Sequence, residues 1–297
     1  MKVLMTGGSG FIGRHVLNIL LEQQLEVAAI GHENDSWLNS QPCTIIHADL
    51  LKDNPEELFR EHQFTHLLHL AWYAEPGKYW TSFQNFHWVH ATLELVREFC
   101  ATGGSKVLIA GTSAEYLWDG SPCHEERTPL EPSSLYGTAK DATRRLVTAL
   151  CAQNEVALSW VRIFQAYGSG ENDQRLIPSI LEVFKGGREP FSINTSVSRD
   201  FLHVSDVASA ISTLLIEEHQ GVYNVCSGVP VNLGDLIKIA AETAGSDPSS
   251  LLALSKSRDN DPTTIVGEND KLLMTGWHQS YSLERGIQEM IVKMGNR

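Results

Sequence analysis

The chain opens with a glycine-rich turn between two short apolar runs. Val3-Leu4-Met5 precedes the turn, a helical pattern follows over 14–22, and a second apolar run covers 27–30. This order predicts a strand, turn, helix and strand in one βαβ unit, which is the context in which spaced glycines bind dinucleotide phosphates. The helix N-terminus would present free N–H groups to a pyrophosphate that approaches the bare backbone. We predict dinucleotide contacts from Gly7, Gly10, Phe11, Ile12 and Gly13.

Through the first half of the chain, apolar runs alternate with amphipathic segments. The apolar runs cover 3–5, 27–30, 44–46, 66–70, 106–110 and 158–163, and the amphipathic segments cover 14–22, 56–62, 85–102 and 136–154. Strands that alternate with helices predict a parallel sheet covered on both faces. With short, right-handed connections this is a doubly wound Rossmann sheet of the α/β class.

After about residue 165 the alternation loosens. We predict strands over 201–204 and 223–226, with helices over 175–184, 206–217, 233–243 and 283–294. The expected organisation is a dinucleotide-binding Rossmann domain over 1–165, which also receives elements from about 200–226. The remainder, 166–297, is expected to form a smaller, mixed and discontinuous substrate-binding lobe.

Charge and cysteine content disfavour several classes of partner. The 297 residues carry a formal net charge of −13, whereas duplex nucleic-acid binders normally present a basic face. No run approaches the ~20 apolar residues of a membrane span and no apolar leader is found, so we expect a cytoplasmic protein with no membrane partner. The five cysteines are scattered without disulfide or zinc spacing, which predicts reduced thiols and no bound metal.

Tyr136 and Lys140 are the first candidate catalytic pair. A spacing of four residues places both side chains on one face of a helix. A nearby ammonium favours the phenolate, so we expect Lys140 to lower the pKa of Tyr136 and to hold a nicotinamide ribose. The phenol would then exchange a proton with a substrate oxygen. The alternative is a solvated surface pair.

Ser113 is the third candidate, because it follows the predicted strand 106–110. Open α/β sheets bind ligands at the carboxyl ends of their strands. Ser113 can therefore donate a hydrogen bond to a substrate carbonyl opposite Tyr136, although a serine that caps a turn is the alternative. The glycine turn, the serine and the Tyr/Lys pair occur in an order that supports a single site.

With these motifs the chain resembles the extended short-chain dehydrogenase/reductases. The resemblance covers nearly the whole chain and rests on Thr6-Gly-Gly-Ser-Gly-Phe-Ile-Gly13, Ser113-Ala-Glu-Tyr116, Tyr136-Gly-Thr-Ala-Lys140 and Arg199-Asp-Phe-Leu-His-Val-Ser-Asp206. Members are NAD(P)-dependent nucleotide-sugar epimerases, dehydratases and ketoreductases. The resemblance implies catalysis by Ser113, Tyr136 and Lys140. Because relatives often pair through the helix at 85–102, it also implies a homodimer.

The resemblance further implies which residues touch the ligands. The adenine end is assigned to Asp49 and Leu50, and the pyrophosphate and ribose end to Leu70, Ala71 and Trp72. The nucleoside-diphosphate sugar is assigned to Ser113, Gln165, Arg175, Arg199 and Arg258. Surface ion pairing is the alternative for the last two arginines. Trp72 and Tyr73 are added to the substrate residues because they directly follow His69-Leu-Ala71 at the end of the predicted strand 66–70 and so should face the pocket. We expect Phe83, Phe86 and Trp88 to serve core packing or a dimer face, and His124 to be an ordinary loop residue.

Two departures from the family pattern refine the expectation. Gly31-His32 stands where NAD-preferring members keep an acidic residue, and Arg14 can reach a 2′-phosphate, so NADP is favoured. NAD is the alternative, with Glu33 or Asp35 as a displaced acid and Arg14 solvated. The 4,6-dehydratases carry Asp-Glu after the catalytic hydroxyl, but here Ala114-Glu115 follows Ser113. Dehydration is therefore disfavoured, and Glu115 is expected to be a solvated loop residue.

We therefore expect NADPH-dependent reduction of a nucleotide-linked 4-keto-6-deoxy sugar, with the proton supplied by Tyr136. The alternative is a nucleotide-sugar 4-epimerase with the same residues and a tightly held NAD. A non-catalytic NAD(P)-sensing protein on this fold is a third, weaker interpretation.

Overall fold

The computed structural model describes residues 1–259 and 261–295. Its larger layer is a seven-stranded sheet in the order β3-β2-β1-β4-β5-β6-β9, with every neighbouring pair parallel. The strands are β1 (Lys2–Thr6), β2 (Glu26–Gly31), β3 (Thr44–His47), β4 (His66–His69), β5 (Lys106–Thr112), β6 (Ala157–Ile163) and β9 (Gly221–Val225). The predicted doubly wound α/β fold is confirmed.

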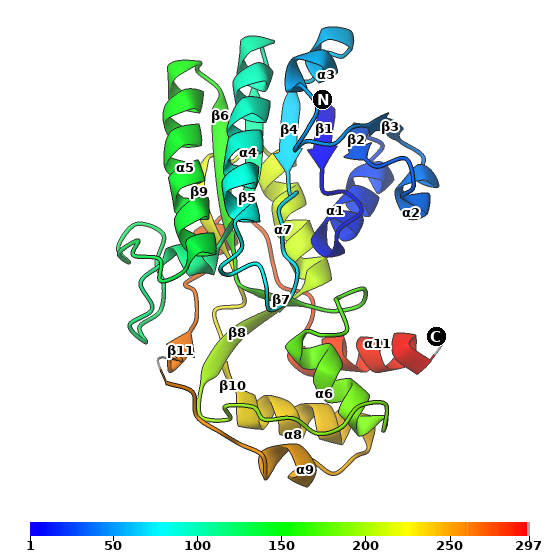
Figure 1. Cartoon of the computed structure of the whole chain (residues 1–297), viewed down its shortest axis with the longest axis vertical. Helices are drawn as coiled ribbons and strands as arrows, with labels where there is room; N and C mark the ends of the chain where they lie inside the picture. Colours follow the sequence, from blue (N-terminus) through cyan, green and yellow to red (C-terminus); the bar gives the residue numbers. More distant parts are fainter. Residues whose placement is uncertain (260, 296–297) are drawn as a thin grey trace.

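Helices cover both faces of this sheet (Figure 1). One face carries α1 (Phe11–Glu22) and α7 (Val204–Ile216), which pack against each other. The other carries α3 (Pro55–Glu61), α4 (Gln84–Ala101) and α5 (Leu135–Gln153). Each face has its own buried apolar cluster, and Leu17 and Phe99 are fully buried examples. Burial on both faces is what makes the strands continuously apolar.

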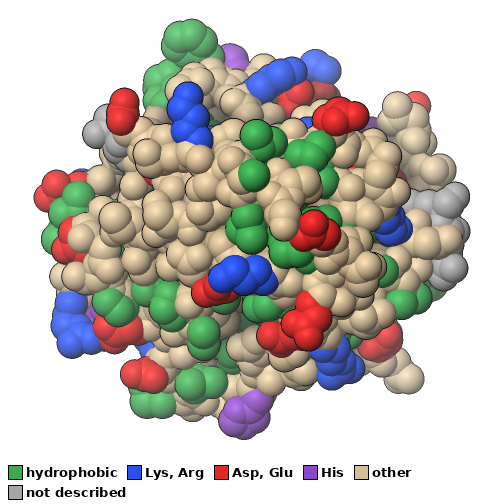
Figure 2. All heavy atoms as spheres, turned by 90° about the horizontal axis from the view of Figure 1, so that it is seen from below, with side chains coloured by type: hydrophobic (Ala, Val, Ile, Leu, Met, Phe, Trp, Pro, Cys, Tyr) green, Lys and Arg blue, Asp and Glu red, His purple; other side chains and the backbone are tan. Residues whose placement is uncertain are grey.

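A smaller lobe lies below the carboxyl ends of the large sheet (Figure 1). Its second sheet centres on β8 (Ser198–His203), which pairs with β7 (Gln165–Tyr167), β10 (Pro230–Asn232) and β11 (Thr264–Ile265). The lobe also contains α6 (Leu176–Phe184), α8 (Leu233–Ala244), α9 (Ser249–Leu252) and α11 (Leu283–Gly295) around a third apolar cluster. On its outer surface, acidic, basic and apolar side chains are interspersed (Figure 2).

The chain passes more than once between the two layers. β8 pairs within the smaller sheet, the next helix, α7, packs on α1, and β9 forms the edge of the large sheet. Short elements with little periodicity were not predicted, among them α2 (Ser36–Asn39), α10 (Asp270–Leu273) and a 3₁₀ turn at Ser113–Glu115. Within the described part of the chain, none of the helices combines the length and apolarity that crossing a bilayer requires.

Candidate functional site

The glycine turn forms a cradle at the end of β1. Gly7 has a φ of +73°, and its carbonyl accepts a hydrogen bond from Gly10 N at 3.0 Å. A Cβ at Gly13 would overlap the carbonyl oxygen of Gly7, so only glycine fits there. These three glycines line a cavity of about 370 Å³ that also contacts Phe11, Ile12, Leu70, Trp72 and Arg175.

A second cavity, of about 280 Å³, continues from Gly7 on the other side of the turn. Its walls include His32, Asp49, Leu50, Ala71 and Trp88. Two cavities that meet at a phosphate-type glycine turn and a helix N-terminus fit an extended dinucleotide. The residues present therefore suit the cofactor that the resemblance implies. Trp88, which we expected in the core or at a dimer face, instead contributes to this cavity.

Arg14 and Gly31 bear on the choice between NAD and NADP. The exposed Arg14 donates from Nε to Ser9 O at 2.7 Å, and its guanidinium lies 4.7 Å from the centre of the Trp37 ring. A Cβ at Gly31 would overlap the side chain of Leu38, so close packing against Leu38 also explains why a glycine stands at this position. The expected contact of Arg14 with a 2′-phosphate stays a prediction.

Ser113, Tyr136 and Lys140 come together on the walls of one cavity of about 190 Å³. Tyr136 lies in the first turn of α5, where Ser134 caps the helix by accepting from Gly137 N at 3.1 Å. Its own backbone N–H donates to Trp80 O at 3.1 Å. Phe11 and Ile12 line both this cavity and the glycine cradle. The proton-transfer candidates thus share a wall with the predicted cofactor site.

The electrostatics of Tyr136 and Lys140 differ from the expectation. Burial raises the pKa of the Tyr136 phenol above its usual value, with the Thr112 hydroxyl acting in the opposite direction. Lys140 donates to Ala110 O at 2.8 Å and lies 3.8 Å from the centre of the Trp72 ring. Burial lowers the pKa of Lys140 to about 7. The expected lowering of the Tyr136 pKa by Lys140 is therefore wrong for this structure, because desolvation dominates both groups.

Aromatic rings and a second hydroxyl surround Tyr136. The Tyr79 and Trp80 rings meet it edge-on, with centres 4.8 and 5.8 Å away. Thr112, directly before Ser113, also lines this cavity, and Trp118 Nε1 donates to Ser113 O at 3.0 Å. Sequence reasoning missed these wall residues. The only sequence feature that could have pointed to Thr112 is its hydroxyl group, which directly precedes that of Ser113 at the end of the same predicted strand.

Glu115 corrects another expectation. The sequence suggested a solvated loop residue, but the side chain is fully buried. It forms an ion pair with Arg162 at 2.8 Å and accepts from Trp160 Nε1 and Thr112 N, both at 2.9 Å. Glu115 thereby ties the end of β5 to β6. The ion pair and the two hydrogen bonds of Glu115 hold in place the turn that carries Ser113.

The substrate-side residues separate into two groups. Gln165, Arg175 and Arg199 line a cavity of about 170 Å³ beside the catalytic one, and Gln165 and Arg175 also line the latter. Arg199 forms an ion pair with Asp261 at 2.5 Å, but both side chains are largely buried, so this is not the surface pair that the alternative described.

Three other residues lie outside these cavities. Among the described residues, the exposed Arg258 and the half-buried Tyr73 do not line any of them, contrary to the expectation. The Tyr73 hydroxyl donates to Glu75 at 2.7 Å. His124 is a loop residue, as expected, with Nδ1 accepting from Glu126 N at 3.1 Å.

Comparisons with known proteins agree with this arrangement. The sequence model of the NAD dependent epimerase/dehydratase family matches residues 3–226. UDP-glucose 4-epimerase of Corynebacterium glutamicum is 27% identical over 318 residues, which cover 97% of this chain and 94% of the relative. The dTDP-6-deoxy-L-talose 4-dehydrogenase (NAD(+)) of Aggregatibacter actinomycetemcomitans is 27% identical over 244 residues, which cover 78% of this chain and 87% of the relative.

The fold has the same relatives. The crystal structure of UDP-glucose 4-epimerase of Thermus thermophilus in complex with NAD is similar, with a TM-score of 0.85, 25% identity and coverage of 98% of both chains. The predicted resemblance to extended short-chain dehydrogenase/reductases and the expectation of an enzyme are confirmed. Since the family model matches residues 3–226 of the 297, this chain belongs to the NAD dependent epimerase/dehydratase family.

Proposed function

We propose that this enzyme catalyses the 4-epimerisation of a nucleoside-diphosphate sugar with a retained NAD. The observation that carries the proposal is the shared wall between the glycine cradle and the cavity that holds Ser113, Tyr136 and Lys140. The relatives named UDP-glucose 4-epimerase support the same choice. Reduction of a 4-keto-6-deoxy sugar, which we expected first from the sequence, becomes the second candidate.

The chain's own residues would act on the oxygen at C4 of the sugar. Bound NAD would supply the oxidising and reducing chemistry at that carbon. Tyr136 would accept the hydroxyl proton and return it, since its side chain lines this cavity together with Thr112. Ser113 would donate a hydrogen bond to the same oxygen as negative charge develops on it. Lys140 would hold the ribose end of the cofactor.

The remaining wall residues suit the diphosphate and the sugar ring. Arg175 and Gln165 offer guanidinium and amide donors where the catalytic and substrate-side cavities meet. Trp72, Tyr79 and Trp80 offer ring faces against which a sugar can pack. We propose that Arg199 contributes only if its ion pair with Asp261 opens.

The second candidate is favoured by two observations. One is the relative named dTDP-6-deoxy-L-talose 4-dehydrogenase (NAD(+)). The other is that Gly31 and His32, which line the cavity of about 280 Å³ at the end of β2, bring no carboxylate that would repel a 2′-phosphate. A substrate panel separates the two candidates. Purified protein is incubated with UDP-glucose, and separately with NADPH and a dTDP-4-keto-6-deoxyhexose.

The two reactions give different readouts. Formation of UDP-galactose without added cofactor supports the epimerase, whereas oxidation of NADPH only with the keto-sugar supports the reductase. If no uridine, thymidine, cytidine or guanosine diphosphate sugar is epimerised or reduced, both candidate functions are contradicted. Release of the bound nucleotide by denaturation and its identification by mass distinguishes NAD from NADP.

We also propose that two copies pair through α4 and α5. Phe86 on α4 is 56% exposed and Leu146 on α5 is 52% exposed, although both are apolar. Large exposed apolar side chains on adjacent helices are typical of an association surface. Light scattering should give twice the chain mass for the wild type and the single chain mass for Leu146→Glu. A wild type that is monomeric at micromolar concentration would contradict this assembly.

A further inference from the structure

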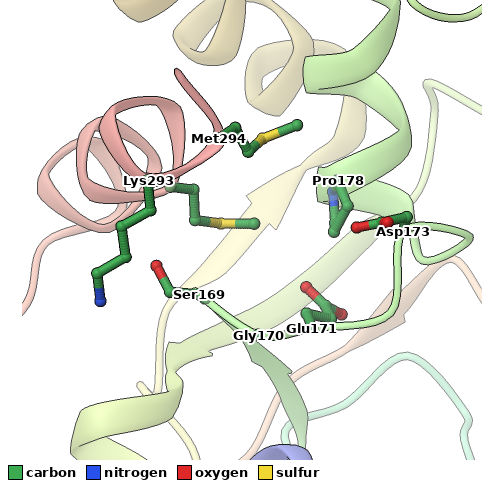
Figure 3. A pocket seen from close by; sticks show the side chains of 9 residues that line it. Ser169, Gly170, Glu171, Asp173, Pro178, Lys293 and Met294 are labelled. Carbon is green, nitrogen blue, oxygen red and sulfur yellow. The ribbon is translucent and has the colours of Figure 1, made fainter. Parts of the chain in front are cut away.

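Glu171 is a buried acid in the loop between β7 and α6. Its side chain is 7% exposed, and Oε1 lies 3.8 Å from Arg175 Nε, too far for a hydrogen bond. Among the described residues, its other oxygen, Oε2, has no hydrogen-bond partner. Figure 3 shows the carboxyl group pointing into a cavity between its own loop, Pro178 on α6 and the end of α11. A buried, incompletely satisfied carboxyl group is costly and needs an explanation.

The position of Glu171 gives such an explanation. It lines the cavity in Figure 3, the glycine-cradle cavity and the substrate-side cavity. Arg175 lines the glycine-cradle cavity, the catalytic cavity and the substrate-side cavity. The loose Glu171–Arg175 pair therefore lies at the junction between the predicted cofactor site and the predicted sugar-nucleotide site.

Arg175 also connects this junction to the catalytic phenol. Its guanidinium carbon lies 5.9 Å from the centre of the Tyr79 ring, and the Tyr79 ring meets Tyr136 edge-on at 4.8 Å. Burial is the main influence on the pKa of Tyr136 and raises it, while the positive charge of Arg175 acts in the opposite direction. The position of Arg175 thus matters to both ligand binding and proton transfer.

The surroundings of Glu171 allow its charge to change. Burial raises the pKa of its carboxyl group to about 8, although the positive charge of Arg175 and the backbone N–H of Gly168 beside the carboxyl group oppose that rise. The other charged groups that line the three cavities around Glu171 are Glu75, Asp173, Arg199 on β8 and Lys293 on α11. Lys293 is paired with Glu289 at 2.7 Å.

We propose that Glu171 is a positioning residue that holds Arg175 at this junction and takes up a proton when a nucleoside diphosphate draws the guanidinium away. A forked guanidinium binds phosphate oxygens better than a carboxylate 3.8 Å away. The incoming negative charge and the loss of its partner both favour the protonated acid. The proton comes from solvent, and no covalent bond changes. This inference rests on the proposed function for its ligand class.

Calorimetry counts the protons. Full-length protein, with the nucleotide that it retains on purification, is titrated with UDP at pH 7 and pH 9 in Tris and in bicine. The difference in apparent enthalpy between the two buffers gives the number of protons taken up. With a pKa of about 8, Glu171 is mostly protonated at pH 7 and about 90% ionised at pH 9.

The comparison with Glu171→Gln isolates this residue, because Lys140 can also take up a proton and is present in both proteins. At pH 9 the wild type should take up about 0.9 proton more than Glu171→Gln, and at pH 7 about 0.1 more. Between pH 8 and pH 9 the affinity of the wild type for UDP should fall about fivefold further than that of the variant. Glu182→Gln, which removes a charge from α6 outside the cavities, should match the wild type.

Three results would overturn the inference. Equal proton uptake by the wild type and Glu171→Gln at pH 9 would show that Glu171 does not titrate on binding. If Glu182→Gln took up as few protons at pH 9 as Glu171→Gln, the uptake would depend on the general charge of α6 and not on Glu171. Failure of UDP, dTDP and CDP to bind would remove the ligand class. If UDP binds with the predicted uptake but no sugar nucleotide is epimerised, the proposed function fails and the role of Glu171 stands.

Discussion

In the proposed reaction the chemistry depends on Tyr136, whose side chain lines the catalytic cavity together with Thr112. Tyr136→Phe removes the proton donor and acceptor but leaves the ring in its contacts with Tyr79 and Trp80. Turnover should fall by roughly 10²–10⁴-fold. Binding of NAD, followed by thermal shift, should stay within about twofold. Tyr73→Phe, which removes a hydroxyl outside the cavity, is the matched control and should keep full activity; equal loss of activity in both variants would contradict the assignment.

Lys140 gives a prediction for stability against pH. Its pKa is lowered by burial to about 7 in the folded protein, whereas an unfolded lysine titrates near 10.4. Between these values the unfolded state binds more protons, so the contribution of Lys140 to stability rises as pH rises through that window. Below pH 7 the buried charge is a penalty of a few kcal/mol, since each pKa unit corresponds to about 1.4 kcal/mol.

Lys140→Met should therefore raise the melting temperature relative to the wild type at pH 6, and the gain should shrink toward pH 10. Paired thermal melts across this range give the difference directly. A gain that is constant with pH, or that grows at alkaline pH, would show that the ammonium is not desolvated as the structure indicates.

At the scale of elements, the Glu115–Arg162 pair fixes the end of β5 against β6. Both side chains are almost completely buried, so removing one charge leaves the other without compensation. Glu115→Ala should lower the free energy of unfolding by roughly 3–5 kcal/mol. Urea denaturation measures the loss, and Glu126→Ala, an acidic neighbour whose side chain is 75% exposed, should change it by less than about 1 kcal/mol. Similar effects in the two variants would mean that the buried pair does not stabilise the turn.

Elements also show where prediction from the sequence succeeds and where it stops. The glycine turn, β5 and α5 have local signals, and these bring Ser113, Tyr136 and Lys140 to one cavity as the order of motifs predicted. The burial of Glu115 has no local signal, because its partner Arg162 follows 47 positions later on another strand. The mutual electrostatics of Tyr136 and Lys140 depend on burial, which spacing along a helix does not report.

For the whole molecule, the sequence predicted the parallel sheet because alternating apolar and amphipathic segments extend through the first half. The paths of β8, α7 and β9 between the two layers depend on long-range pairing. The same limit applies to the substrate side. The sequence predicted substrate contacts for Gln165, Arg175 and Arg199, which line one cavity. It also predicted them for Arg258 and Tyr73, which lie outside that cavity. Nothing local in the sequence distinguishes these two from the others.

The central claim is that one enzyme removes hydrogen from C4 of a nucleoside-diphosphate sugar and returns it to the same carbon. The most direct test uses UDP-glucose labelled with deuterium at C4, without added cofactor, followed by nuclear magnetic resonance. We expect UDP-galactose that keeps the deuterium at C4, and no product with Tyr136→Phe. Product that has exchanged the deuterium for solvent hydrogen, or unchanged turnover in the variant, would contradict it.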